Sequence, residues 1–175
     1  MPKSSSQQIK KDEQKILNIL QTSANESIDN IAKKCGFSRQ KVWRIIKKLN
    51  DTKIIWGYSA VCDLERYQLK RFTMLMKRST VPIGKEVIDE ILTTRLDDLL
   101  PGSVIKIENI EYVNGCFDGI CTFLAEDIIT AKRFSERFSN KFRPYIANIE
   151  ILEHIIAIRK QSIRNPNLKE QIQFL

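Results

Sequence analysis

Apolar side chains recur at helical spacing in three short stretches within the first 50 residues. The first stretch begins at Asp12, whereas residues 1–8 before it are polar and serine-rich, a composition that favours disorder. Ser27 is placed to cap a second helix, and Ser38 to cap a third helix that ends near Asn50. The pattern therefore predicts three short helices in succession.

A glycine separates the second predicted helix from the third. Gly36 follows the second helix directly, at the position where a left-handed residue commonly ends a helix. Three helices within about 40 residues, with a tight turn between the last two, are typical of a helix-turn-helix. Residues 1–53 are therefore predicted to form a helix-turn-helix domain.

The segment after this domain changes character. β-branched and aromatic residues dominate Ile54 to Cys62, which predicts a strand that leaves the domain. The polar stretch from Asp63 to Lys70 then indicates a linker. Residues 54–70 are therefore predicted as a strand followed by a connection.

The remaining pattern alternates between the two kinds of element. Strands are predicted over Phe72–Lys77, Val104–Val113, Phe117–Ala125 and Asn148–Arg159, and helices over Lys85–Leu100 and from Asp127 onward. A change of parity near Glu108-Asn109 indicates a β-bulge, and Asn114-Gly115 favours a hairpin turn.

The order β-α-β-β-α-β is that of a ferredoxin-like unit. We therefore predict an α+β protein with an N-terminal helix-turn-helix domain and a C-terminal ferredoxin-like βαββαβ domain at residues 71–160. A tail at residues 161–175 is expected to end in a short helical turn.

The positive charge is concentrated in the first part of the chain. The net charge is +8, and residues 1–70 contain 14 basic and 7 acidic residues, against 15 and 14 in residues 71–175. This asymmetry predicts an N-terminal domain that binds a polyanion, joined to a domain with another purpose.

Several function classes are disfavoured by composition. No apolar run approaches the roughly 20 residues of a membrane span, and the N-terminus lacks the apolar core of a signal peptide, so we expect a cytoplasmic protein. The four cysteines form no CxxC pair and the chain has one histidine, His154, so no metal or cofactor is predicted. No nucleophile–base set, carboxylate pair or phosphate loop is visible, and no catalytic residue is assigned.

The third predicted helix has two different faces at about 100° per residue. Val42, Ile46 and Leu49 face inward with Ile45 beside them, and the opposite face is polar and cationic. The candidate DNA-contacting residues are Ser38, Arg39, Gln40, Lys41, Trp43, Arg44, Lys47 and Lys48.

The residue types suggest separate roles on double-stranded DNA. Gln can pair with adenine and Arg with guanine in the major groove, which makes Gln40 and Arg44 candidates for reading bases. Lys47 and Lys48 lie further along the helix and suit phosphates. The alternative is a solvated basic face, with Trp43 packed on the first helix or on a neighbouring subunit.

The segment Ile28 to Tyr58 resembles the head of the leucine-responsive/asparagine-regulator (Lrp/AsnC) transcription factors. The resemblance rests on Ile31-Ala32, Gly36-Phe37-Ser38, Val42, Leu49, Ile55 and Gly57-Tyr58, and on the turn Asn114-Gly115-Cys116-Phe117-Asp118, which looks like the family's Gly-x-x-Asp turn. It covers about residues 10–160. Two positions depart from the pattern: Ile45 stands where Arg is common, and Lys53 replaces the usual Gly, which is expected to alter the turn before the strand.

The resemblance implies a homodimer or higher homo-oligomer that pairs through the strand at Ile54 to Cys62 and through its sheets. It also implies a small effector, often an amino acid, held near Asn114, Gly115, Cys116 and Asp118. Backbone groups at a glycine turn suit a carboxylate, and Asp118 suits an ammonium. The alternative is that Asn114-Gly115 is only a hairpin turn that Asp118 caps.

The sequence thus favours a sequence-specific, homo-oligomeric transcriptional regulator. One alternative is an enzyme of the sirohaem decarboxylase type, which resembles this family in architecture and would need polar groups such as His154 and Arg143. Another alternative is a chromatin-organising protein that binds DNA without sequence preference.

Overall fold

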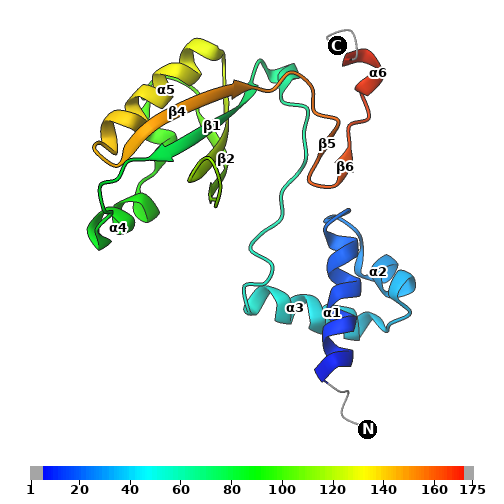
Figure 1. Ribbon diagram of the computed structural model, residues 1–175. Helices are drawn as coiled ribbons and strands as arrows, with labels where there is room; N and C mark the ends of the chain where they lie inside the picture. Colours follow the sequence, from blue (N-terminus) through cyan, green and yellow to red (C-terminus); the bar gives the residue numbers. More distant parts are fainter. Residues whose placement is uncertain (1–5, 172–175) are drawn as a thin grey trace. The chain divides into compact units, whose positions relative to one another are not determined.

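The computed structural model describes residues 6–171, and within them the chain forms two compact units (Figure 1). The first unit contains residues 6–62 and 157–171, and the second contains residues 63–156. Within residues 6–171, no helix combines the length and the apolar character that crossing a membrane requires.

The first unit begins with the predicted helix-turn-helix. Its helices are α1 (Ser6–Leu20), α2 (Ile28–Cys35) and α3 (Arg39–Asp51). Both predicted caps are confirmed, because the side chain of Ser27 accepts from the N–H of Asn30 and that of Ser38 from the N–H of Lys41.

Helix α1 starts earlier than its apolar stripe indicated. Residues 6–8 are helical, so the expected disorder is wrong for them, while residues 1–5 lie outside the described part. The side-chain amide of Gln8 donates to Asp12 at 2.8 Å, one turn later, which extends the helix beyond the apolar pattern.

A small apolar core holds the three helices together. Ile16 of α1, Ile31 and Ala32 of α2 and Val42 of α3 are buried against one another. Leu49 is also fully buried, so the predicted inward face of α3 is confirmed.

Helices α2 and α3 end in the same kind of turn. Gly36 has a φ of 68°, and the N–H that follows it donates to the carbonyl of Ala32 at 2.9 Å. Lys53 has a φ of 58°, and the N–H that follows it donates to the carbonyl of Leu49 at 3.0 Å. Both turns therefore have the Schellman pattern, in which the left-handed residue is usually glycine. Lys53 thus adopts the left-handed conformation that glycine favours, and the turn keeps its usual geometry. The expected change of turn geometry is therefore wrong, and the lysine at this position carries local backbone strain.

The predicted strand over Ile54 to Cys62 is wrong for the single chain. The segment is irregular, and Trp56 within it is 95% exposed. A strand is defined by hydrogen bonds to a neighbouring strand, and no part of residues 6–171 pairs with this segment.

The second unit contains an antiparallel sheet of four strands. Its elements in chain order are β1 (Lys70–Arg78), α4 (Lys85–Thr93), β2 (Lys106–Tyr112), β3 (Gly119–Ala125), α5 (Ile128–Lys141) and β4 (Ile146–Glu153). The spatial order of the strands is β2-β3-β1-β4. The β-α-β-β-α-β architecture is therefore confirmed.

Aromatic side chains fill the space between the sheet and α5, which lies across one face of the sheet in Figure 1. The ring centroids of Phe123 and Phe134 are 4.9 Å apart, and those of Phe138 and Phe142 are 4.8 Å apart. Tilted ring pairs at these distances are favourable, so this core is larger and more aromatic than that of the first unit.

The helix predicted over Lys85–Leu100 is shorter than expected. It ends at Thr93, whose hydroxyl donates to the carbonyl of Asp89 at 2.8 Å, and a 3-10 turn follows over Leu96–Leu99. That break lets Leu96 enter the core and lets the Asp97 carboxylate accept from the backbone of β2.

Local features of the predicted hairpin are present. The register between β2 and β3 shifts between Ile107 and Asn109, which confirms the bulge. Helix α5 begins at the predicted cap, where the side chain of Asp127 accepts from the N–H of Thr130 at 2.7 Å.

The last predicted strand extends too far. Strand β4 ends at Glu153, and the chain then leaves the sheet. Two-residue strands, β5 (Arg159–Lys160) and β6 (Ile163–Arg164), form a hairpin that the sequence did not predict. The short helix α6 (Leu168–Gln171) confirms the expected helical turn in the tail.

Candidate nucleic-acid interface

The outward face of α3 exposes three polar residues in adjacent turns. Gln40, Arg44 and Lys47 are all exposed. Within residues 6–171, no hydrogen bond or ion pair engages the side chain of Gln40 or Arg44. The ammonium of Lys47 lies 5.3 Å from the ring centroid of Trp43, which is itself 51% exposed. These side chains are therefore available to a ligand that approaches this face.

Two other lysines of α3 are directed toward α1. The ammonium of Lys41 lies 2.7 Å from a carboxylate oxygen of Asp12 and 4.0 Å from the ring centroid of Phe37. The ammonium of Lys48 lies 2.6 Å from a carboxylate oxygen of Glu13. Lys41 and Lys48, two turns apart, thus join α3 to α1 in two places.

The electrostatics of the first pair follow from its position. Asp12 is 4% exposed, so its charge needs a partner. Hydrogen bonds from Lys41 and Gln8 hold the pKa of the Asp12 carboxyl below its ordinary value of 3.8. The pair therefore stabilises the packing of α1 on α3 when Asp12 is ionised.

Arg39 and Ser38 stand at the beginning of α3. The guanidinium of Arg39 lies 3.5 Å from a carboxylate oxygen of Asp29 on α2, with both side chains largely exposed. The hydroxyl oxygen of Ser38 accepts from the N–H of Lys41 at 3.2 Å. Arg39 is thus loosely paired, and Ser38 acts as a cap.

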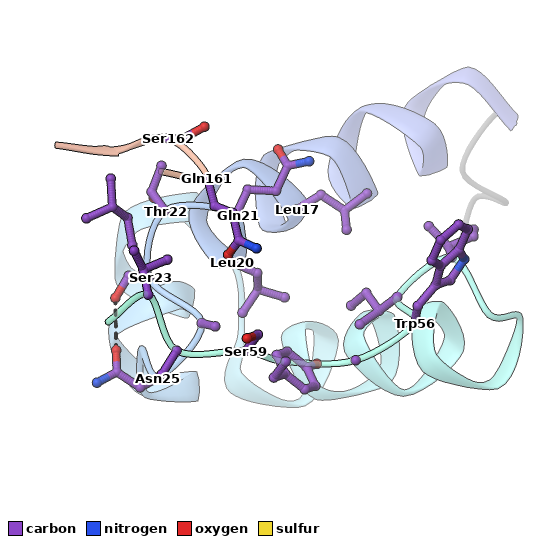
Figure 2. Close-up of a pocket in the computed structure, with 18 residues that line it drawn as sticks. Leu17, Leu20, Gln21, Thr22, Ser23, Asn25, Trp56, Ser59, Gln161 and Ser162 are labelled. Atoms are coloured by element: carbon purple, nitrogen blue, oxygen red, sulfur yellow. Dashed lines mark hydrogen bonds between the residues drawn. The ribbon is translucent and has the colours of Figure 1, made fainter. Parts of the chain in front are cut away.

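A separate groove lies in the same unit. Figure 2 shows Leu17 and Leu20 of α1 and Trp56 along this groove, with Gln161 and Ser162 at its edge. No outward-facing residue of α3 lines it. The groove and the exposed face of α3 are therefore different surfaces.

The four residues proposed for an effector have different surroundings. Asn114, Gly115 and Cys116 form an exposed turn, whereas Asp118 lines a cavity of about 70 Å³ in the second unit. One carboxylate oxygen of Asp118 accepts from the N–H of Arg78 at 2.9 Å.

The environment of Asp118 accounts for its ionisation. The N–H of Arg78, followed by the ammonium of Lys77 at 3.4 Å, holds the pKa of the Asp118 carboxyl below 3.8. The Asp118 side chain thus ties the end of β1 to the start of β3, and its printed partners lie on β1 and not in the turn at Asn114-Gly115.

Two further groups, His154 and Cys121, have structural surroundings. Nε2 of His154 lies 2.6 Å from the hydroxyl of Thr73, just beyond the end of β4. Burial raises the pKa of the Cys121 thiol to about 12. Within residues 6–171, no group of three or more His, Cys, Asp or Glu side chains is arranged to hold a metal ion.

Two contacts of this surface were missed by sequence reasoning, namely those of Lys41 with Asp12 and of Lys48 with Glu13. The available signal was the acidic pair Asp12-Glu13 at the start of the apolar stripe of α1. The sequence alone could not pair these carboxylates with particular lysines, because the side chains of α1 that face α3 depend on the angle at which the two helices cross.

Comparison with known proteins supports both units. Residues 13–55 match the winged helix-turn-helix DNA-binding family. No curated protein sequence is similar enough to this chain to count as a relative.

Solved structures resemble the chain over nearly its whole length. The AsnC family transcriptional regulator from Agrobacterium tumefaciens is 21% identical with a TM-score of 0.65, and covers 91% of this chain and 97% of its own. The Neisseria meningitidis regulator NMB0573 in complex with L-methionine is 15% identical, with a TM-score of 0.64 and the same coverages. The feast or famine regulatory protein of M. tuberculosis, complexed with L-methionine, is 11% identical with a TM-score of 0.68, and covers 90% of this chain and 99% of its own. The fold expected from the Lrp/AsnC resemblance is therefore confirmed.

Proposed function

We propose that the protein is a DNA-binding transcriptional regulator that inserts α3 into the major groove of a duplex. The observation that carries the proposal is the exposed, unpaired polar face of α3 within a segment that matches winged helix-turn-helix DNA-binding proteins. The names of the structurally similar proteins, which are transcriptional regulators, support the same function.

The geometry suits this mode of binding. A major groove about 12 Å wide admits one α-helix, and the N-terminal part of a recognition helix meets the base edges. Gln40 and Arg44 lie in that part. Lys47 lies about one turn beyond Arg44, where it can contact a phosphate.

The decisive experiment compares two double variants of the full chain on duplex DNA. Arg44→Ala/Lys47→Ala should weaken binding by about 100-fold or more, because it removes one contact to a base and one to a phosphate. Lys132→Ala/Arg137→Ala removes the same two charges from the exposed side of α5 and should bind as the unmodified chain does. Equal affinities for both variants would overturn the proposal.

Sequence preference separates a regulator from a protein that binds any duplex. Competition between a selected duplex and random DNA measures it directly, and a regulator should prefer its site by about 1,000-fold or more. Equal competition by random DNA would favour the chromatin-organising alternative.

We further propose self-association through the segment from Ile54 to Cys62. The segment is rich in exposed apolar side chains, with Ile54 and Tyr58 each 54% exposed, and lacks a partner strand within residues 6–171. Trp56→Asp should shift the protein toward the monomer in sedimentation experiments, and an unchanged oligomeric state would contradict this pairing.

We also propose that the protein responds to a small effector. Two structurally similar regulators were solved with L-methionine, and Asp118 could hold an ammonium if its contact with Lys77 opened. DNA affinity measured with and without L-methionine, in the unmodified chain and in Asp118→Asn, tests it. An effect of L-methionine that Asp118→Asn leaves intact would place the site elsewhere.

A further inference from the structure

We infer that base-specific readout on α3 is carried by two residues, Gln40 and Arg44, which recognise an adenine and a guanine about two base pairs apart. This inference rests on the proposed function. It assigns the remaining cations of α3 to phosphate contact or to holding the helix in place.

The spacing of the two residues sets the spacing of the bases. Gln40 and Arg44 are four positions apart, which is about 6 Å along the helix axis and about 40° around it. Successive bases on a strand are about 3.4 Å apart along the duplex, so with α3 running along the duplex the two side chains reach positions about two base pairs apart.

Their chemistry specifies which bases they read. A glutamine amide donates to and accepts from the adenine edge, and a guanidinium donates two hydrogen bonds to guanine. Neither side chain has a protein partner within the described residues that would have to be given up. Binding a base therefore costs Gln40 and Arg44 no existing contact.

The other cations have contacts that occupy them. Lys41 and Lys48 are paired with Asp12 and Glu13 of α1, and the guanidinium of Arg39 lies 3.5 Å from a carboxylate oxygen of Asp29 on α2. Lys47 is a point charge over the Trp43 ring, a geometry without the bidentate fork that distinguishes guanine.

The same pairs make the readout precise. Lys41 and Lys48 fasten α3 to α1 at two points two turns apart, so α3 is held against rotation about its own axis. A helix fixed in this way presents Gln40 and Arg44 at a constant angle, which bidentate hydrogen bonds require.

The test begins with duplexes selected from a random pool by the full chain. Affinities are then measured on the selected duplex and on duplexes with single base-pair changes, for the unmodified chain, Arg44→Lys and Gln40→Ala. Arg44→Lys keeps the charge, so it separates base reading from simple attraction to phosphate.

The expected result is position-specific. Arg44→Lys should lose about 5- to 150-fold on the duplex with the guanine, and bind the duplex lacking it as the unmodified chain does, with the same salt dependence. Gln40→Ala should behave in the same way at the adenine. Lys47→Ala should instead weaken binding to all duplexes alike and lower the salt slope by about one.

Each contrary result has a distinct meaning. A uniform loss, or no loss, for Arg44→Lys and Gln40→Ala across all duplexes would overturn the inference while leaving DNA binding intact. Failure of the unmodified chain to bind any duplex would overturn the proposed function itself. Circular dichroism melting curves of each variant check that a loss of affinity does not result from unfolding.

Discussion

The two sides of α3 carry similar cations in different settings. On one side, Lys41 and Lys48 lie within 2.7 Å of carboxylate oxygens of α1. On the other side, Arg44 and Lys47 have no acidic partner within residues 6–171. A count of the basic residues on a helix therefore overstates the number that a ligand can use.

The largest expected difference between the two sides is in DNA affinity. Arg44→Ala should weaken binding to a selected duplex by about 10-fold or more, since a base contact is worth ~1–3 kcal/mol. Lys48→Ala should weaken it by less than about 3-fold, because its charge is already compensated by Glu13. Fluorescence anisotropy of a labelled duplex measures both, and similar losses would remove the distinction.

The next-largest effect is on stability. Here the lysine that faces α1 should matter more than the exposed arginine. Lys41→Ala leaves the buried Asp12 without its ion-pair partner and should destabilise the first unit by about 1–2 kcal/mol. Arg44→Ala should change stability by less than about 0.5 kcal/mol, because Arg44 is exposed and unpaired. Amide hydrogen exchange within α1 reports on this unit alone, and equal protection in the two variants would contradict the prediction.

A third variant stabilises α3 without touching either set of cations. Lys53→Gly should stabilise the first unit by about 1 kcal/mol, because it relieves the left-handed conformation at the end of the helix. Gly36→Ala is the matched control at the other turn and should destabilise by a similar amount. DNA affinity of Lys53→Gly should stay the same, and a large change would mean that Lys53 itself contacts DNA.

The smallest expected effect is a pH dependence of stability, which arises from Asp12 and its ion pair with Lys41. The pKa of Asp12 is lowered by folding, so the folded state favours its ionised form. The stability that ionised Asp12 contributes is therefore fully present above the ordinary aspartate pKa of 3.8. It is lost as the pH falls through the lowered pKa of the folded state. Unfolding between pH 2 and 5 should show this loss, and Asp12→Asn should show less of it. Identical pH profiles for Asp12→Asn and the unmodified chain would contradict the assignment.

Features that depend on neighbouring residues were predicted well. Ser27, Ser38 and Asp127 cap helices as expected, because a cap is a contact between a side chain and a backbone group three residues away. The bulge at Glu108 was visible as a change of alternation. The end of the helix that begins at Lys85 could not be predicted in this way. The helix stops at Thr93, and Leu96 beyond it packs into a core made by distant strands.

The amino-acid sequence was enough to predict the helix-turn-helix, the order of elements in the ferredoxin-like unit and the outward placement of Gln40 and Arg44. These follow from periodicity and from caps, which act over a few residues. The folded structure was needed to show which lysines of α3 meet Asp12 and Glu13. It was also needed to show that the segment from Ile54 to Cys62 pairs with no strand within residues 6–171. Ion pairs and strand pairing join groups that are far apart in sequence, so they form only where packing brings those groups together.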